Sequence, residues 1–83
     1  MKDAGGRNEN EVSACVRHAL TEYFRRLDGA KPAPVHEMVI RSVEKPMIEV
    51  VLAYTNGNQT KAAAVLGLNR NTLRKKMVEY GIE

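Results

Sequence analysis

The sequence predicts an all-α protein of four helices, and three observations support this fold class. Apolar residues recur at steps of three and four along most of the 83-residue chain, the spacing that brings side chains onto one side of a helix. No segment shows the strict alternation of apolar and polar residues that is typical of a half-buried strand. Glycine, asparagine and proline interrupt the helical pattern and divide it into four segments.

The first helix is predicted over residues 11–27. Its apolar positions follow helical spacing: Val12, Val16, Leu20, Tyr23, Phe24 and Leu27. Asp28 and Gly29 then end the helix, because aspartate tolerates and glycine favours the left-handed backbone that closes a helix. Residues 1–10 are polar and contain two glycines, so we expect a flexible N-terminal tail.

The second helix is predicted over residues 35–54, with apolar positions again at helical spacing: Met38, Val39, Val43, Met47, Val50, Val51 and Tyr54. Pro46 lies inside this pattern, so we expect one kinked helix rather than two separate ones. Ile48 and Leu52 widen the apolar stripe, and a helix that is apolar on two sides needs two packing partners. We therefore expect residues 11–54 to form a helical dimerisation region.

The size of the chain also favours a dimer. A chain this short buries only about 60–65% of its unfolded surface, which leaves a single core marginal. Its one cysteine, Cys15, cannot form an intrachain disulfide. A partner subunit is then the expected source of additional stability.

Residues 55–83 are predicted to form a helix-turn-helix, with helices over 59–66 and 70–80. Counted from Gln59, Ala63 is the fifth residue, Gly67 the ninth and Leu73 the fifteenth. A small side chain lets two short helices cross closely, glycine adopts the turn backbone, and leucine fills the space beneath. The agreement of all three positions indicates this motif.

The excess positive charge of the chain lies in its last third. Residues 1–54 carry eight basic and eight acidic side chains, whereas residues 55–83 carry five basic and two acidic ones. This asymmetry indicates an anionic partner, and double-stranded DNA is the partner that a helix-turn-helix docks on through the major groove. A basic helix face that is merely solvated is the alternative.

The second helix of the motif carries the candidate base contacts, which fall on or near one face: Arg70, Asn71, Arg74 and Lys75. Arginine and lysine can donate hydrogen bonds to guanine O6 and N7 and to phosphates. Candidate phosphate contacts lie around them: Asn58, Thr60, Lys61, Asn69 and Thr72. Asn58 and Asn69 are equally suited to cap the two helices, and both roles can coexist. For Lys61, a solvated surface lysine is the alternative.

No cofactor, metal ion or small-molecule substrate is expected. Cys15, His18 and His36 are the soft ligand candidates, and their spacing is not that of a zinc site. Ser13, Cys15 and His18 share one helical segment and cannot form a nucleophile and base with an oxyanion hole, so we expect no enzyme activity. The sequence shows neither a membrane-spanning apolar run nor a signal peptide, so a cytoplasmic protein without membrane contact is expected.

Two segments resemble the Fis (factor for inversion stimulation) family of bacterial nucleoid-associated proteins. The stretch VEKPMIEVVLAYTNGNQTKAAAVLGLNRNTLRKKMVEYGI is similar to the family's C-terminal part, most specifically in GNQT and NRNTLRKK, and ALTEYFRRLDG is similar to its first helix. The resemblance covers about residues 12–82. It implies a homodimer whose first two helices intertwine with those of the partner, and two closely set recognition helices that bend DNA.

The resemblance also implies which residues contact DNA. By position it gives DNA-contacting or adjacent roles to Lys76 and to seven residues named above: Asn58, Thr60, Asn69, Arg70, Thr72, Arg74 and Lys75. Arg70 is the expected main guanine contact, and Asn69 is expected where the minor groove is compressed. The protein is expected to act in the nucleoid as a transcription regulator, with RNA polymerase as a further candidate partner.

The sequence departs from enteric members of the family at two places. Val78 and Glu79 follow the lysine pair where enteric Fis carries further lysines, so less DNA wrapping is expected. Only about ten residues precede the first helix, without a strand pattern for the family's β-hairpin arm. Recombinase stimulation is therefore expected to be weak or absent.

Two other interpretations stay open. The C-terminal module also resembles the DNA-binding domain of NtrC-type activators, which makes a local sequence-specific activator one alternative. The start at Met1, with no receiver or ATPase domain before the module, favours a free-standing Fis-like protein. The other alternative is a helical protein–protein adaptor whose basic helix binds an acidic protein.

Overall fold

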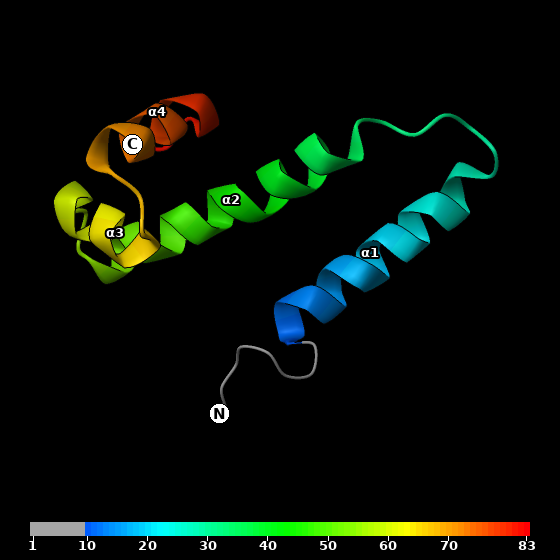
Figure 1. Ribbon diagram of the computed structural model, residues 1–83, viewed down its shortest axis with the longest axis horizontal. Helices are drawn as coiled ribbons and strands as arrows, with labels where there is room; N and C mark the ends of the chain where they lie inside the picture. The colour runs from blue at the N-terminus through cyan, green and yellow to red at the C-terminus, as the bar shows by residue number, and fades with distance from the viewer. Residues whose placement is uncertain (1–9) are drawn as a thin grey trace. The chain divides into compact units, whose positions relative to one another are not determined.

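The computed structural model describes residues 10–83, and in that range it contains four α-helices and no strand (Figure 1). Their bounds are Glu11–Leu27 for α1, Val35–Tyr54 for α2, Gln59–Leu66 for α3 and Arg70–Tyr80 for α4. All four agree with the predicted ranges, so the all-α fold class is confirmed. The predicted flexible tail falls almost entirely on residues 1–9, which lie outside the described residues.

The two ends of α1 are fixed by local hydrogen bonds. Asn10 begins the helix, because its Oδ1 accepts a hydrogen bond of 2.8 Å from the backbone N–H of Ser13. Asp28 ends it with a left-handed φ of 51°, and the N–H of Ala30 donates to the carbonyl of Leu27 at 2.9 Å. The predicted stop is therefore formed, whereas Asn10, assigned to the tail from sequence, is the cap of the helix.

α2 is one continuous helix, as predicted, although Pro46 lies inside it. The proline ring removes the amide hydrogen that the carbonyl of Ser42 would otherwise accept. The Ser42 hydroxyl donates to the carbonyl of Met38 at 2.7 Å, and both features favour a local bend. The size of the kink stays a prediction.

The chain divides into two compact units, Met1–His36 and Glu37–Glu83, and the core lies in the second. The buried side chains that form this core come from α2, α3 and α4: Ile48, Leu52, Ala62, Ala63, Leu73, Met77 and Tyr80. Ile48 and Leu73 are fully buried. One side of α2 thus shares a core with the helix-turn-helix, although the sequence division placed them in separate regions.

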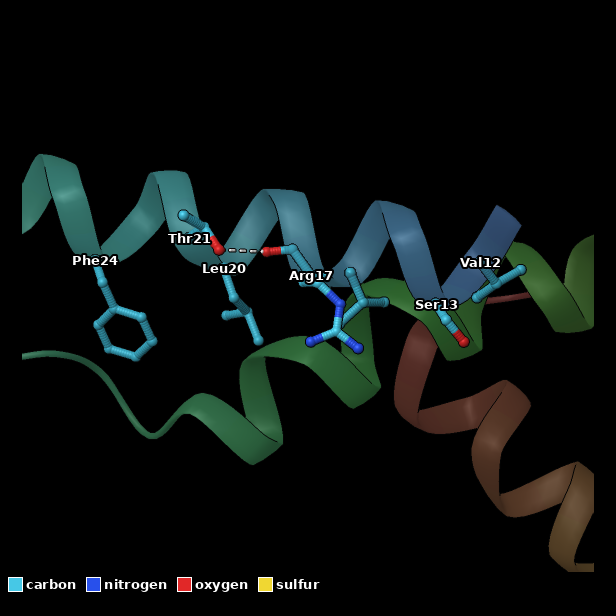
Figure 2. Close-up of a pocket in the computed structure, with 7 residues that line it drawn as sticks. Val12, Ser13, Arg17, Leu20, Thr21 and Phe24 are labelled. Carbon is cyan, nitrogen blue, oxygen red and sulfur yellow. Dashed lines mark hydrogen bonds between the residues drawn. The ribbon is translucent and has the colours of Figure 1, made fainter. Parts of the chain in front are cut away.

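In the first unit, α1 contributes no buried residue. Figure 2 shows Val12, Leu20 and Phe24 projecting from the same side of the helix, where they line an open hollow of about 600 Å³. Val12 is 61% exposed and Phe24 48% exposed. The predicted amphipathic pattern is therefore present, and its apolar side is accessible in the single chain.

Two searches of the described residues bear on function classes. None of the helices is both long and apolar enough to cross a membrane. Within residues 10–83, no group of three or more histidine, cysteine, aspartate or glutamate side chains is placed to hold a metal ion.

Candidate nucleic-acid interface

α3 and α4 pack closely because the residues between them are small. Ala62 and Ala63 of α3 are 0% and 3% exposed and lie in the same core as Leu73 of α4. A larger side chain at either alanine would push the helices apart or strain the core. The steric pattern predicted from Ala63 to Leu73 is thus formed.

Gly67 makes the turn between these helices. Its φ of 77° lies in the left-handed region that glycine adopts without a steric cost. Its N–H donates to the carbonyls of Ala63 and Ala64, and the N–H of Leu68 donates to the Ala63 carbonyl at 2.9 Å. These bonds satisfy the last carbonyls of α3 and fix where the chain enters α4.

α4 has a buried inner side and an exposed outer side. Leu73, Met77 and Tyr80 form the inner side. The outer side is an open hollow of about 460 Å³ lined by Asn71, Arg74, Lys75 and Val78. The structure thereby brings together three of the four candidate base-contacting residues.

The fourth of these residues, Arg70, is exposed at the first position of α4. It is not among the residues that line the hollow of the outer side. Its position at the N-terminal end of the helix is the one from which a recognition helix reaches base edges.

Asn58 and Asn69 cap the two helices of the motif. Asn58 Oδ1 accepts from the N–H of Lys61 at 3.0 Å, and Asn69 Oδ1 accepts from the N–H of Thr72 at 2.8 Å. Each cap uses the side-chain oxygen, so the amide nitrogen of the same exposed side chain keeps its donors. The capping role is present, and it remains compatible with a phosphate contact.

The other candidate phosphate contacts are not gathered into the hollow on α4. Thr60 and Lys61 are exposed on α3, and Thr72 is half-buried on α4. Lys61 lines a separate open hollow, whose other residues are Tyr54, Thr55, Asn56, Ala64 and Val65.

Lys76 is placed differently from its neighbour Lys75. Lys76 is half-buried, and its Nζ lies 2.9 Å from Oε2 of Glu44 on α2. The other oxygen of Glu44, Oε1, accepts a hydrogen bond of 2.5 Å from the Tyr80 hydroxyl. Glu44 therefore joins two residues of α4 to α2.

A second ion pair lies beside the first. Arg41 Nη1 on α2 is 2.6 Å from Oε2 of Glu79, and the Arg41 guanidinium carbon is 5.0 Å from the centroid of the Tyr80 ring. We call the five residues of these contacts the α2–α4 clamp: Arg41, Glu44, Lys76, Glu79 and Tyr80.

The clamp shifts two pKa values. The hydrogen bonds from Tyr80 and then from Lys76 lower the pKa of Glu44 below its usual range. The hydrogen bond to Glu44 raises the pKa of Tyr80 to about 12. At neutral pH both shifts favour an ionised Glu44 and a neutral Tyr80, the forms that the contact needs.

The sequence analysis did not identify the clamp. The available signal was that Arg41 and Glu44 stand three to four residues before Ile48, and Leu52 follows at the same spacing. They therefore continue the stripe of α2 that packs on the helix-turn-helix. A polar end to a buried stripe predicts polar partners opposite, but it does not say which residues supply them.

Comparison with known proteins points to one family. Residues 39–80 match the family described as bacterial regulatory protein, Fis family. A protein of Neisseria meningitidis serogroup A, named as a Fis-like DNA-binding protein, is 47% identical over 72 residues, covering 87% of this chain and 91% of that protein. One of the same name from Ralstonia nicotianae is 43% identical over 75 residues, covering 90% and 97%.

A third relative carries the family name itself. DNA-binding protein Fis of Actinobacillus succinogenes is 51% identical over 67 residues, which cover 81% of this chain and 68% of that protein. The family match begins within α2 and ends at the last residue of α4, so it includes the core and every candidate contact. The resemblance seen in the sequence is confirmed, and the chain belongs to the Fis family of bacterial regulatory proteins.

Proposed function

We propose that this chain is a homodimeric DNA-binding and DNA-bending protein that acts as a nucleoid-associated transcription regulator. One observation carries the proposal: α4 is held in the core by its inner side and presents Asn71, Arg74 and Lys75 together on its outer side. A helix held in this way is what a helix-turn-helix inserts into the major groove. The names of the relatives, which describe DNA-binding proteins, support the same function.

The proposed contacts divide into bases and phosphates. Arg70 is the main guanine contact, because its guanidinium can donate two parallel hydrogen bonds to O6 and N7 from the first position of α4. The outer side of α4 contacts base edges and nearby phosphates. The phosphate contacts around it are Asn58, Thr60, Lys61, Asn69 and Thr72.

The dimer is proposed from apolar side chains that the single chain leaves accessible. α1 buries none of its residues. α2 buries Ile48 and Leu52 but leaves Val50 68% exposed and Tyr54 78% exposed. A second copy of the chain would cover both surfaces and remove their apolar area from water.

Bending is proposed from the dimer and from the family. Each chain would present one α4, and straight DNA offers successive major-groove faces about 34–36 Å apart. We expect the two helices to be set closer together than this, so that DNA bends to meet both. The sequence preference would then depend largely on how easily the site deforms, and an A/T-rich centre with a narrow minor groove is the expected favourite.

Gel-shift titrations at two salt concentrations test the proposal. We expect a dimer that binds an A/T-centred palindromic duplex more tightly than a scrambled one, with affinity falling steeply as salt rises. Duplexes that carry the same site at different positions should migrate differently when the DNA is bent.

The outcomes separate the parts of the proposal. A stable dimer that binds neither duplex would contradict DNA binding and favour the protein–protein adaptor. Binding with equal mobility of the permuted duplexes would contradict bending alone. A monomer that binds DNA would contradict the dimer.

A further inference from the structure

Lys75 and Lys76 are neighbours in the sequence, but the structure gives them different surroundings. Successive residues of an α-helix are about 100° apart around its axis. Lys75 is exposed on the outer side of α4 with Asn71 and Arg74. Lys76 is half-buried on the side that meets α2, with its ammonium 2.9 Å from Glu44.

Glu44 is held from two directions. One carboxylate oxygen accepts from Tyr80 and the other pairs with Lys76, so both contacts fix the last turns of α4 on α2. The carboxyl stays ionised at neutral pH, because these contacts lower its pKa. A carboxylate in this position competes with a DNA phosphate for the Lys76 ammonium.

The rest of the C-terminal half of α4 adds no accessible cation. Val78 is apolar and 82% exposed. Glu79 is acidic and pairs with Arg41 of α2. Within the clamp, two cations are balanced by two carboxylates. The exposed cations of α4 are Arg70, Arg74 and Lys75, and all of them lie in its first half.

We infer that Glu44 is a positioning residue that withholds Lys76 from DNA, so that the phosphate-contacting cations of α4 end at Lys75. The inference rests on the proposed DNA-binding function and deepens it. It assigns this chain a shorter electrostatic contact along the DNA than the paired lysines of its sequence suggest. Glu44 acts through Lys76 and Tyr80 and does not itself touch DNA.

The salt dependence of DNA affinity tests this inference, because its slope counts phosphate contacts. Each contact contributes about 0.9 to the slope of log affinity against log salt on B-DNA. With the full chain and a duplex of random sequence, Lys75→Gln should lower the slope by about 1.8 for a dimer, which carries the change twice. Lys76→Gln should lower it by less than half as much.

Glu44→Gln should have the opposite effect. The amide oxygen still accepts from Tyr80, but the charge that holds Lys76 is removed. The released lysine should raise the slope toward one additional contact per chain, about 1.8 for the dimer. The double variant Glu44→Gln with Lys76→Gln should return to the slope of the original protein, because the gain depends on Lys76.

Glu49→Gln is the matched control, since it removes the same charge from an exposed position of α2. It should not raise the slope as Glu44→Gln does. Urea unfolding of each variant shows that the fold is intact.

Each remaining result points to a different fault. Equal losses for Lys75→Gln and Lys76→Gln, or an unchanged slope for Glu44→Gln, would overturn the inference and leave DNA binding standing. If the original protein shows no salt-dependent binding and Lys75→Gln has no effect, the proposed function itself fails.

Discussion

Asn58 and Asn69 show how a single side chain can serve both the fold and the interface. Each uses its carboxamide oxygen to cap a helix, at 3.0 Å and 2.8 Å from the backbone nitrogen that donates to it. The amide nitrogen of the same group is a donor of the kind that binds phosphate. Replacing asparagine with aspartate separates the two roles, because aspartate caps a helix about equally well but offers no donor.

Asn69→Asp should therefore weaken DNA binding without weakening the fold. We expect its free energy of unfolding to stay within about 0.5 kcal/mol of the original, whereas Asn69→Ala should lose about 1 kcal/mol with the cap. DNA affinity should fall with the aspartate, because a negative charge replaces a donor at a phosphate. Urea unfolding and fluorescence anisotropy measure the two quantities.

Asn10→Asp is the control for this substitution, since Asn10 makes the same kind of cap at α1. It should change neither stability nor DNA affinity appreciably. An Asn69→Asp variant that binds DNA as tightly as the original would restrict Asn69 to its capping role.

Arg70 is the residue on which the sequence preference should depend most. Arg70→Ala should cost about 1–3 kcal/mol at each half-site, which is roughly a 5- to 150-fold loss of affinity. Anisotropy titrations measure this on the preferred duplex and on duplexes in which one guanine is replaced by 7-deazaguanine, which lacks the N7 acceptor. If Arg70 reads that guanine, the two changes together should cost little more than either alone. Fully additive losses at every guanine would show that Arg70 binds elsewhere.

At the scale of elements, the helix bounds were predictable because they depend on local signals. The left-handed backbones of Asp28 and Gly67 end helices where the residue types suggested. The contact between α3 and α4 was predictable for a related reason, because Ala63, Gly67 and Leu73 belong to one short segment. No long-range information was needed for these features.

What could not be predicted is which side of α2 meets which partner. The sequence showed two apolar sides, and the structure buries Ile48 and Leu52 against the helix-turn-helix while Val50 and Tyr54 stay exposed. Periodicity gives the sides of a helix but not their partners. Tyr80 was missed as a core residue for the same reason, since its partner Glu44 lies 36 positions away in the chain.

The clamp between α2 and α4 should make stability depend on pH at both extremes. The folded state lowers the pKa of Glu44, so its contribution to stability is present above the ordinary carboxyl pKa of about 4.3 and is lost as pH falls through the lower folded value. The folded state raises the pKa of Tyr80 to about 12, so its contribution is complete below the ordinary value of about 10 and is lost as pH rises toward 12.

The difference in unfolding free energy between the original protein and Tyr80→Phe isolates this dependence from other titrating groups, among them Lys76, Arg41 and Glu79. We expect the difference to be constant from about pH 6 to 9 and to shrink outside the two windows. Urea unfolding followed by circular dichroism measures it. A difference that stayed flat to pH 12 would mean that the hydroxyl of Tyr80 contributes nothing through Glu44.

For the whole molecule, the distribution of the core is the decisive property. The buried core comes entirely from residues of the second unit, and α1 supplies none of it. An isolated helix of 17 residues with no buried side chain is marginal in water. Its amphipathic side, with Val12 and Phe24 exposed, therefore needs a surface to cover it if α1 is to stay folded. The proposed second copy is the source of that surface.

Leu20→Glu tests this dependence, with His18→Glu as the control on the polar side of the same helix. Leu20 lines the apolar hollow of α1, so the proposed dimer would bury it twice (Figure 2). Losing about 1.5–3 kcal/mol per buried leucine should weaken dimerisation by at least 100-fold, and His18→Glu should leave it nearly unchanged. Sedimentation equilibrium measures the association, and helical content should fall with it as α1 frays. Because DNA bending needs two α4 helices held together, the Leu20→Glu variant should also lose bending at concentrations where the control retains it. A Leu20→Glu protein that remains a fully helical dimer would place the subunit interface away from α1.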